Sequence, residues 1–418
     1  MKTSLKSPFS ETEKGIEANN ILRSCVHCGF CTATCPTYQL LGDELDSPRG
    51  RIYLIKELLE GNHVSRTTQQ HLDRCLTCRS CETTCPSGVE YGRLLDIGRH
   101  AVEKKIKRTI SQQIFRYLLN EVLTNKKIFS YLIFLGKILQ PLMPPAIKRK
   151  IPSVESKQIA WPKNNHVRKM ILLEGCVQST LAPNINAASA KILDKLGIQA
   201  IVSSAAGCCG AVTYHLNKQD KSLKQIKKNI DAWWPLIERG AEAIVMTASG
   251  CGVTVKEYGY LLSDDLDYSK KAKRISEITF DLSEILTFEQ DQLKIILNNN
   301  NTKKNKDFIA FHSPCTLQHG QKCKGKVEAI LEAAKFKLAL VQDAHLCCGS
   351  AGTYSIFQPK ISNKLLKNKI DSLTKDTPRV IATANIGCLT HIQSGTEMRV
   401  VHWAELVLEK IQNEGANL

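Results

Sequence analysis

Several common functional signatures are missing from this chain of 418 residues. No strand-like run leads into the G-x-G-x-x-G of a dinucleotide-binding turn, and the phosphate-binding G-x4-G-K-[ST] loop is also missing. No nucleophile elbow and no Ser, His and Asp order stands out. The sequence therefore predicts no flavin or nicotinamide site on this chain, and any such cofactor must lie on another chain.

Long apolar runs are missing as well. No uninterrupted run reaches the length needed to span a bilayer. The first residues, MKTSLKSPFSE, contain no apolar segment of the kind found in secretory signals. We therefore expect a cytoplasmic location, or a peripheral one on the inner face of the cell membrane. In a reducing cytosol the 17 cysteines indicate metal or redox chemistry rather than disulfides.

Two cysteine runs stand out in the first hundred residues. Each reads C-x2-C-x2-C-x3-C-P, and each is complete. This is the bacterial ferredoxin spacing for [4Fe–4S] clusters, in which the fourth cysteine of each run ligates the cluster of the other run. Zinc is disfavoured because tetrahedral zinc sites use paired C-x2-C knuckles. The spacing predicts one cluster on Cys25, Cys28, Cys31 and Cys85, and a second cluster on Cys75, Cys78, Cys81 and Cys35.

Helices are expected to carry these runs. Apolar residues recur at three- and four-residue steps across 47–61, and Gly61 suits a helix C-terminus. Shorter helical stretches at 16–22 and 67–72 lead into the two runs. We therefore predict that residues 1–100 form a helical ferredoxin-type domain with two [4Fe–4S] clusters. Three arginines either temper the negative charge of these clusters or are simply solvated: Arg49, Arg51 and Arg79.

Positive charge gathers in the next segment. The chain has a net charge of +17, and residues 101–170 hold 15 Lys and Arg against 3 Asp and Glu. An apolar stretch at 128–139 is followed by the basic cluster 148–150. Basic flanks around an apolar helix suit a membrane surface with anionic lipid or a groove on a partner subunit; the alternative is a buried helix with a basic linker. Nucleic acid is disfavoured because aromatics are not interleaved with the basic residues. We predict a basic, apolar helical linker over 101–167, with 128–150 as its candidate membrane surface.

From about residue 168 a pattern of alternating strands and helices occurs twice. Each copy opens with an apolar strand, at 170–173 and at 308–311, and a cysteine follows. A Cys-Cys-Gly doublet begins 32 residues after that cysteine in both copies, and a later strand ends in a Gly-Cys turn. Open α/β sheets place their sites at such strand ends. We predict a tandem duplication: a first cysteine-rich domain over 168–297, a polar linker over 298–305, and a second cysteine-rich domain over 306–412. The fold class is α+β multidomain.

Each copy offers four cysteines to a cofactor. Adjacent cysteines do not easily bridge each other, but both can point into a cluster, and the glycine after the doublet allows close backbone approach. The alternative is that these cysteines are small buried hydrophobic residues. Cys323 has no counterpart in the first copy, and we expect it to be incidental. A further iron–sulfur cluster, in each copy or shared between them, would use Cys176, Cys208, Cys209 and Cys251, then Cys315, Cys347, Cys348 and Cys388.

These motifs together resemble a known family of iron–sulfur subunits, in which a ferredoxin domain is fused to two cysteine-rich (CCG) domains. The family includes subunits of glycolate oxidase, anaerobic glycerol-3-phosphate dehydrogenase, lactate-utilisation systems and heterodisulfide reductase. The segments that resemble the glycolate oxidase subunits most closely are 25–46, 85–91, 229–235, 247–252 and 315–319. In heterodisulfide reductase-type units the last cysteine is part of C-x2-C, whereas here it stands alone at Cys251 and Cys388.

The resemblance implies an electron-transfer subunit of a glycolate oxidase complex, with no catalytic residue on this chain. FAD on partner subunits would oxidise glycolate to glyoxylate, and the clusters would pass the electrons singly towards a quinone-type acceptor. One alternative keeps this role but changes the substrate to lactate, glycerol 3-phosphate or another 2-hydroxy acid. A second alternative is an iron–sulfur redox sensor or scaffold. Eight ferredoxin-type ligands plus a duplicated cysteine module favour electron transfer over sensing.

Overall fold

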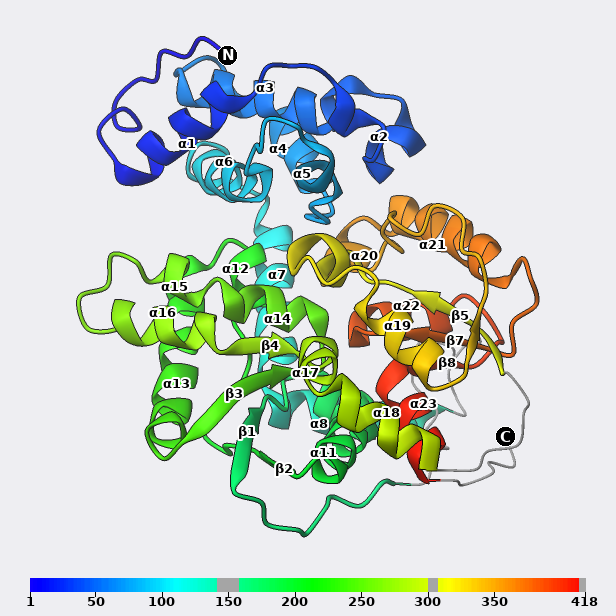
Figure 1. Ribbon diagram of the computed structural model, residues 1–418. Coiled ribbons are helices and arrows are strands. Elements are labelled where there is room, and N and C mark those ends of the chain that lie inside the picture. The colour runs from blue at the N-terminus through cyan, green and yellow to red at the C-terminus, as the bar shows by residue number, and fades with distance from the viewer. Residues whose placement is uncertain (141–157, 300–306, 413–418) are drawn as a thin grey trace. The chain divides into compact units, whose positions relative to one another are not determined.

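The computed structural model describes residues 1–140, 158–299 and 307–412 (Figure 1). The chain divides into two compact units. Unit 1 comprises residues 1–117 and 343–369, and unit 2 comprises residues 118–342 and 370–418. The predicted basic cluster 148–150 and most of the predicted linker 298–305 lie outside the described residues.

Unit 1 is built around four helices, and short polar side chains cap the starts of three of them. The Ser47 hydroxyl accepts from the Gly50 amide at the start of α3 (Pro48–Leu59), and Pro48 takes the first helical position. The same kind of cap starts α1 (Glu13–Ser24) and α4 (Arg66–Asp73). Helix α6 (Tyr91–Lys105) packs against all three (Figure 1), and their apolar faces form one core. The helices expected at 16–22, 47–61 and 67–72 are confirmed as α1, α3 and α4.

The cysteine runs lie in short turns between these helices. In each run the residue before the second cysteine has a positive φ, at His27 and Thr77, and so does the residue after it, at Gly29 and Arg79. Left-handed backbone is costly for residues other than glycine and tends to persist where a functional loop requires it. The matched positions show that both runs follow the same backbone path. The turns also contain short helices: η1 (Phe30–Thr32), α2 (Pro36–Leu41), η2 (Glu44–Asp46) and α5 (Ser80–Thr84).

Residues 343–369, which carry the second cysteine doublet, cluster with this helical unit. The Tyr354 hydroxyl, at the start of α20 (Tyr354–Phe357), donates to the Arg74 carbonyl over 3.1 Å. The Phe357 ring meets Phe115 edge to face, and the Arg116 guanidinium lies 4.5 Å from the centre of that ring. These contacts join a distant part of the chain to the ferredoxin-type unit.

Unit 2 contains two parallel sheets with the same strand order. The first is β2-β1-β3-β4 and the second is β6-β5-β7-β8 (Figure 1). Each central strand is almost entirely buried, as expected where helices cover a parallel sheet. The identical topology confirms the duplication. The strands are β1 (Arg168–Leu172), β2 (Ile198–Ile201), β3 (Ala241–Met246), β4 (Thr279–Asp281), β5 (Phe308–His312), β6 (Lys337–Leu338), β7 (Val380–Thr383) and β8 (Val400–His402).

The two sheets share one hydrophobic core. Helix α11 (Asn184–Lys195) of the first copy packs against α23 (Trp403–Gln412) of the second. In return, α19 (Lys326–Ala333) of the second copy packs against α17 (Leu282–Phe288) of the first. The buried His402 ring hydrogen-bonds the Thr247 carbonyl at 2.9 Å across this boundary. The reciprocal exchange makes the two copies one folded body.

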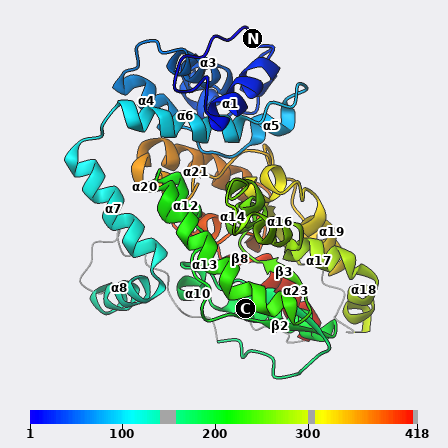
Figure 2. The same cartoon turned by 90° about the vertical axis from the view of Figure 1, so that its left-hand side faces the viewer.

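The remaining helices cover the sheets and extend the unit. Helix α8 (Lys126–Leu139) lies against α10 (Gln178–Leu181), as Figure 2 shows. None of the described helices combines the length and apolar character that crossing a membrane requires. The other elements are α7 (Ile110–Thr124), α12 (Ala211–His215), α13 (Gln219–Glu238), α14 (Ser249–Lys256), α15 (Tyr258–Leu261), α16 (Ser269–Glu277), α18 (Gln290–Asn299), a π-helical turn η4 (Thr316–Gly320), α21 (Pro359–Thr374) and α22 (Ile386–Gln393).

Candidate iron–sulfur centres

Two cavities in unit 1 are lined by cysteines. The first is bounded by Val89, Ile52 and Tyr91 as well as by sulfur. The second is bounded by Arg51, Thr37 and Tyr91. Three cysteines of the first run and two of the second line the first cavity: Cys25, Cys28, Cys31, Cys81 and Cys85. Three cysteines of the second run and one of the first line the second cavity: Cys35, Cys75, Cys78 and Cys81.

The thiols in these cavities are crowded. Burial, followed by the proximity of Cys25, raises the pKa of Cys31 to about 11. Burial and the neighbouring Cys78 raise the pKa of Cys81 well above its usual value. A group that holds these sulfurs as thiolates must therefore supply positive charge, as iron does, and soft thiolate sets are typical of iron–sulfur clusters. The donor set in each cavity fits such a cluster.

The surroundings of the second cavity contain a buried polar network that the cysteine spacing gave no means of predicting. Arg51 is 1 % exposed, and its Nη1 donates to the Thr37 hydroxyl at 3.1 Å. That hydroxyl lies 3.2 Å from the Cys35 Sγ. The Tyr91 hydroxyl donates to the Cys75 Sγ at 3.6 Å. The interpretation of Arg51 as a solvated arginine is therefore wrong.

The first cysteine-rich copy brings its four predicted cysteines together. Cys176 follows β1 after Gly175, which has a φ of 73°. Hydrogen bonds from Cys176 and Cys209 lower the pKa of Cys208, and Cys209 in turn shares a hydrogen bond with Cys251. Three of the four are buried, and Cys251 is partly exposed. The four thiols form a continuous chain at the carboxyl ends of β1, β2 and β3.

Two residues outside the cysteine pattern hold the first doublet in place. The Asn229 side chain accepts from the Gly207 amide at 2.8 Å and donates to the Cys208 carbonyl at 2.9 Å. The Tyr258 hydroxyl donates to the Cys209 carbonyl at 2.9 Å. Asn229 lies in the segment 229–235 that resembles glycolate oxidase subunits, so a signal for it was present. The sequence carried no such signal for Tyr258.

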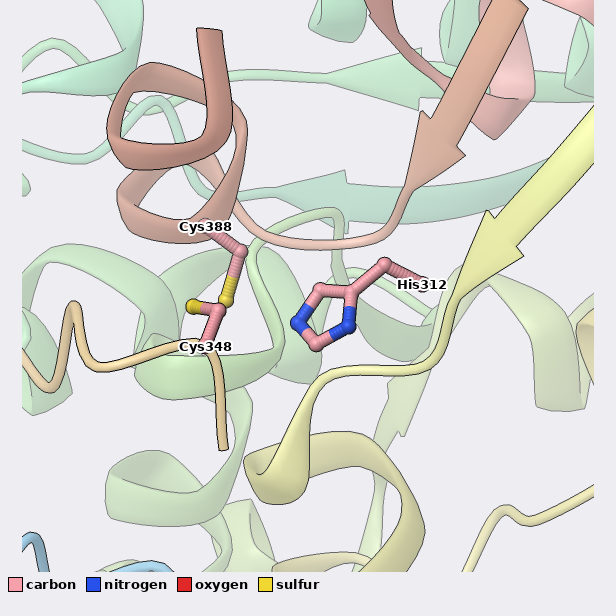
Figure 3. A group of neighbouring side chains, drawn as sticks. All are labelled: His312, Cys348 and Cys388. Carbon is pink, nitrogen blue, oxygen red and sulfur yellow. The ribbon is translucent and has the colours of Figure 1, made fainter. Parts of the chain in front are cut away.

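The four predicted cysteines of the second copy are divided between the two units. Cys315 and Cys388 belong to unit 2, and Cys347 and Cys348 belong to unit 1. In unit 2, His312 ends β5 and Cys388 lies in the first turn of α22, with their ligand atoms within 4.8 Å of each other (Figure 3). The Asn385 amide donates to the Cys388 Sγ at 3.6 Å, and Cys315 is buried at the start of the π-helical turn. Figure 3 also labels Cys348, whose segment belongs to unit 1.

The second doublet has the same local geometry as the first. Gly349, like Gly210, has a positive φ, at 91° and 94° respectively. The hydroxyl of Ser362 donates to the Gly349 carbonyl at 2.8 Å, as that of Ser222 donates to the Gly210 carbonyl at 3.0 Å. Both Cys347 and Cys348 are buried. By contrast, Cys323 lies in the shared hydrophobic core, where burial raises its pKa to about 12.

Comparison with protein families identifies the same three regions. Residues 21–89 match the model of a 4Fe-4S dicluster domain, and residues 170–256 and 309–393 each match that of a cysteine-rich domain. The chain is 52 % identical, over 99 % of its length and 100 % of the relative's, to the glycolate oxidase iron-sulfur subunit of Escherichia coli (strain K12). The chain belongs to the family of glycolate oxidase iron–sulfur subunits. The predicted fold class, the iron–sulfur cofactors and the electron-transfer role are thereby confirmed.

More distant relatives show how the family varies. A probable glycolate oxidase iron-sulfur subunit of Bacillus subtilis (strain 168) is 27 % identical over 97 % of each chain. Lactate utilization protein A of Bacillus pumilus (strain SAFR-032) is 25 % identical but covers 57 % of this chain, although 98 % of its own length is matched. This chain is therefore similar over nearly its full length to the two glycolate oxidase subunits, but over little more than half of its length to the lactate utilization protein.

Proposed function

We propose that this chain is the electron-transfer subunit of a complex that oxidises glycolate to glyoxylate. The observation that supports it best is the identity of 52 % across essentially the whole length to a glycolate oxidase iron-sulfur subunit. FAD-bearing partner subunits take a two-electron hydride equivalent from the substrate. This chain accepts the electrons one at a time and passes them towards a quinone-type acceptor, and the substrate chemistry lies on the partner.

In the ferredoxin-type domain, residues 1–100, we propose that the two cysteine-lined cavities hold the clusters. One [4Fe–4S] cluster, called cluster 1, is held by Cys25, Cys28, Cys31 and Cys85, and cluster 2 by Cys75, Cys78, Cys81 and Cys35. Such clusters supply one-electron redox chemistry without bond breaking. Each run supplies three ligands to one cluster and its fourth cysteine to the other cluster. Each cluster therefore links both runs. Each cavity is lined by all four cysteines proposed for its cluster, and this grouping supports the ligation.

In the cysteine-rich domains, 168–297 and 306–412, we propose a further iron–sulfur cluster on each set of four cysteines. The chain of thiol hydrogen bonds from Cys176 to Cys251 supports the first set. The matched doublet geometry and the family match over 309–393 support the second set, which comprises Cys315, Cys347, Cys348 and Cys388. The segment 101–167 connects these domains to the ferredoxin-type domain.

The surface of α8 supports peripheral binding to a membrane with anionic lipid. Six of its apolar side chains are 42–62 % exposed: Ile128, Tyr131, Leu132, Phe134, Ile138 and Leu139. The helix is held on unit 2 by buried Phe129 and by the Ser130 hydroxyl, which lies 2.7 Å from that of Thr180. It also carries Lys126, Lys127 and Lys137 and no acidic residue. An exposed apolar face with basic residues beside it matches the interfacial helices that bind anionic membranes.

The proposed activity is tested by co-expressing the chain with candidate flavoprotein subunits of a glycolate oxidase and purifying the complex anaerobically. Glycolate should reduce an artificial acceptor dye through the complex, and Cys78→Ser should abolish most of that reduction. The matched control is Cys323→Ala, which leaves the proposed ligands intact. Reduction by lactate or glycerol 3-phosphate in place of glycolate would assign the chain to another 2-hydroxy-acid system. Zinc in place of iron would overturn the proposal.

A further inference from the structure

The two proposed cluster sites in unit 1 differ in the side chains that face their sulfurs. At the site of cluster 2, the Tyr91 hydroxyl donates to the Cys75 Sγ at 3.6 Å. The Thr37 hydroxyl lies 3.2 Å from the Cys35 Sγ, although it also donates to the Asp46 carbonyl at 2.9 Å. Among the described residues, no side-chain O–H or N–H donates to a sulfur of the cluster 1 site. At the cluster 1 site the Cys31 thiol accepts from the backbone amides of Cys31 and Arg49. The two sites therefore differ in the Tyr91 hydroxyl, a side-chain donor that only the cluster 2 site has among the described residues.

The charge around the two sites differs in the same direction. Beside cluster 2, the fully buried Asp46 carboxylate is shared by Arg51 at 3.2 Å and Arg74 at 2.8 Å. The Asp43 carboxylate lies within 4.8 Å of the ligand atoms of Asp46 and His71, but it is exposed and screened by water. Among the mostly buried groups beside cluster 2, two guanidinium groups therefore face one carboxylate. Beside cluster 1, Arg49 pairs one to one with Glu44 at 2.8 Å, and both side chains are at least a third exposed. That pair is neutral and is screened by water.

Reduction adds one negative charge to a cluster, so these differences act on the reduction potential. Hydrogen bonds to sulfur and nearby positive charge favour the reduced form, whereas burial alone disfavours added charge. The nearby positive charge has the larger effect on the potential here, because that charge is itself buried. Charges interact more strongly where the effective dielectric constant is low. Arg51 is 1 % exposed, and its guanidinium donates to the Thr37 hydroxyl at 3.1 Å, next to the Cys35 Sγ. A guanidinium does not lose its proton in proteins, so Arg51 stays charged beside the ligands of cluster 2.

We propose that Tyr91 and the Arg51–Arg74 pair raise the potential of cluster 2 above that of cluster 1, so that cluster 2 takes the first electron. The proposal rests on the ligation proposed above. The electron comes from the partner flavin in the complex or from a chemical reductant in the purified chain, and it reduces iron without breaking a bond. Electrons that enter at cluster 1, where Cys28 is exposed, run downhill to cluster 2.

The loop that ligates cluster 2 also contacts the segment that carries the second cysteine doublet, which belongs to the same unit. Tyr354 donates its hydroxyl hydrogen to the carbonyl of Arg74, the residue directly before Cys75. The segment with the second cysteine doublet is therefore anchored next to the loop that ligates cluster 2. This position makes cluster 2 the exit of the ferredoxin-type domain.

The test is a redox titration of the full, anaerobically loaded chain, followed by electron paramagnetic resonance. Tyr91→Phe removes one hydrogen bond to sulfur and keeps the ring, and Arg74→Gln removes the excess charge from a partly exposed position. Both variants should lower the same midpoint potential, and it should be the higher of the two that belong to the ferredoxin-type domain. Cys78→Ser deletes a ligand of cluster 2, so this variant should lose the shifted signal before the other signal. That loss would assign the shifted signal to cluster 2.

Matched controls are Tyr53→Phe and Arg93→Gln, since both residues lie on the surface of the same helical unit and should leave both midpoints in place. Iron is counted in every sample before the titration. A wild-type chain without iron in the ferredoxin-type domain would refute the ligation itself. Full iron with unshifted midpoints, or a shift of the lower midpoint alone, would overturn the inference about potentials while leaving the ligation intact.

Discussion

The Asp46 carboxylate and the Arg51 guanidinium form an ion pair of 3.2 Å in which both side chains are almost completely buried. Asp46 also accepts from His71 at 3.0 Å, and the Arg51 Nε donates to the His71 carbonyl at 2.8 Å. This pair therefore links η2, α3 and α4 behind the site of cluster 2. Arg49 and Glu44 form a second ion pair in the same unit, but on its surface. The two pairs allow a matched comparison.

We predict that Asp46→Asn destabilises the protein by about 3–5 kcal/mol, because it leaves a buried arginine without its counter-charge. Glu44→Gln, which breaks the exposed pair, should cost no more than about 1 kcal/mol. Thermal unfolding of the two iron-loaded variants under anaerobic conditions checks the difference. Equal losses in the two variants would show that burial does not set the strength of the Asp46 pair.

We predict that Cys78→Ser removes about four of the roughly eight irons of the ferredoxin-type domain, since it deletes one ligand of one cluster. Iron analysis and the visible absorption of the anaerobic protein measure the loss. Cys323→Ala should keep the wild-type iron content because that thiol lies in the hydrophobic core. Loss of all iron from Cys78→Ser would mean that the two clusters assemble only together.

We predict that substituting Phe134 and Ile138 on α8 by serine weakens binding to vesicles containing anionic lipid by roughly tenfold or more. Each apolar side chain contributes about 1.5–3 kcal/mol when it is fully buried, and partial insertion yields a fraction of that. Co-sedimentation with vesicles at low and high salt measures the change. Leu266→Ser is the control, because Leu266 is 98 % exposed and belongs to the loop between α15 and α16 rather than to α8. Unchanged sedimentation of the α8 variant would exclude this surface.

We predict that Glu405 makes the fold less stable as the pH rises. Burial raises the pKa of Glu405 to about 7, whereas an unfolded glutamate titrates near its ordinary value of 4.5. The folded state thus favours the protonated form. Its contribution is fully present below about pH 4.5 and is lost as the pH rises through 7, which amounts to about 3 kcal/mol.

The corresponding measurement compares unfolding midpoints at pH 5.5 and pH 8 for the wild type and for Glu405→Gln. The variant should lose part of the decline with pH, because a glutamine side chain does not ionise. Asp281, the counterpart of His402 at the end of β4, has a pKa raised by burial to about 6 and should account for some of the remainder. Identical pH profiles for the wild type and the variant would contradict this assignment.

Much of the architecture could be predicted because it depends on local spacing. The helices around 16–22, 47–61 and 67–72, and the strands that open each cysteine-rich copy, follow from apolar periodicity and capping residues within a few positions. The duplication could be predicted from the recurring order of cysteine, doublet and Gly-Cys turn. Family comparison confirms the iron–sulfur assignment that rested on C-x2-C-x2-C-x3-C-P.

The surroundings of the sulfurs could not be predicted in the same way. Arg51 and Tyr91 sit in α3 and at the start of α6 as ordinary members of amphipathic helices, and nothing nearby in the sequence relates them to Cys75. Asn229 and Tyr258 likewise reach the doublet 208–209 from distant elements. Such contacts depend on how helices pack over long loops, and local pattern carries no information about that packing.

By itself, the sequence determined the type of cofactor, the number of cysteine modules and the family, because ligand spacing and repeat order are properties of the chain alone. The spacing also predicted which sulfurs share a cluster. Only the tertiary structure decided which arginine is buried beside those sulfurs, and that the segment carrying Cys347 and Cys348 packs with the ferredoxin-type unit. The physical reason is that reduction potential depends on hydrogen bonds, charge and burial around a cluster. Side chains far apart in the chain set these quantities, and folding alone brings them together.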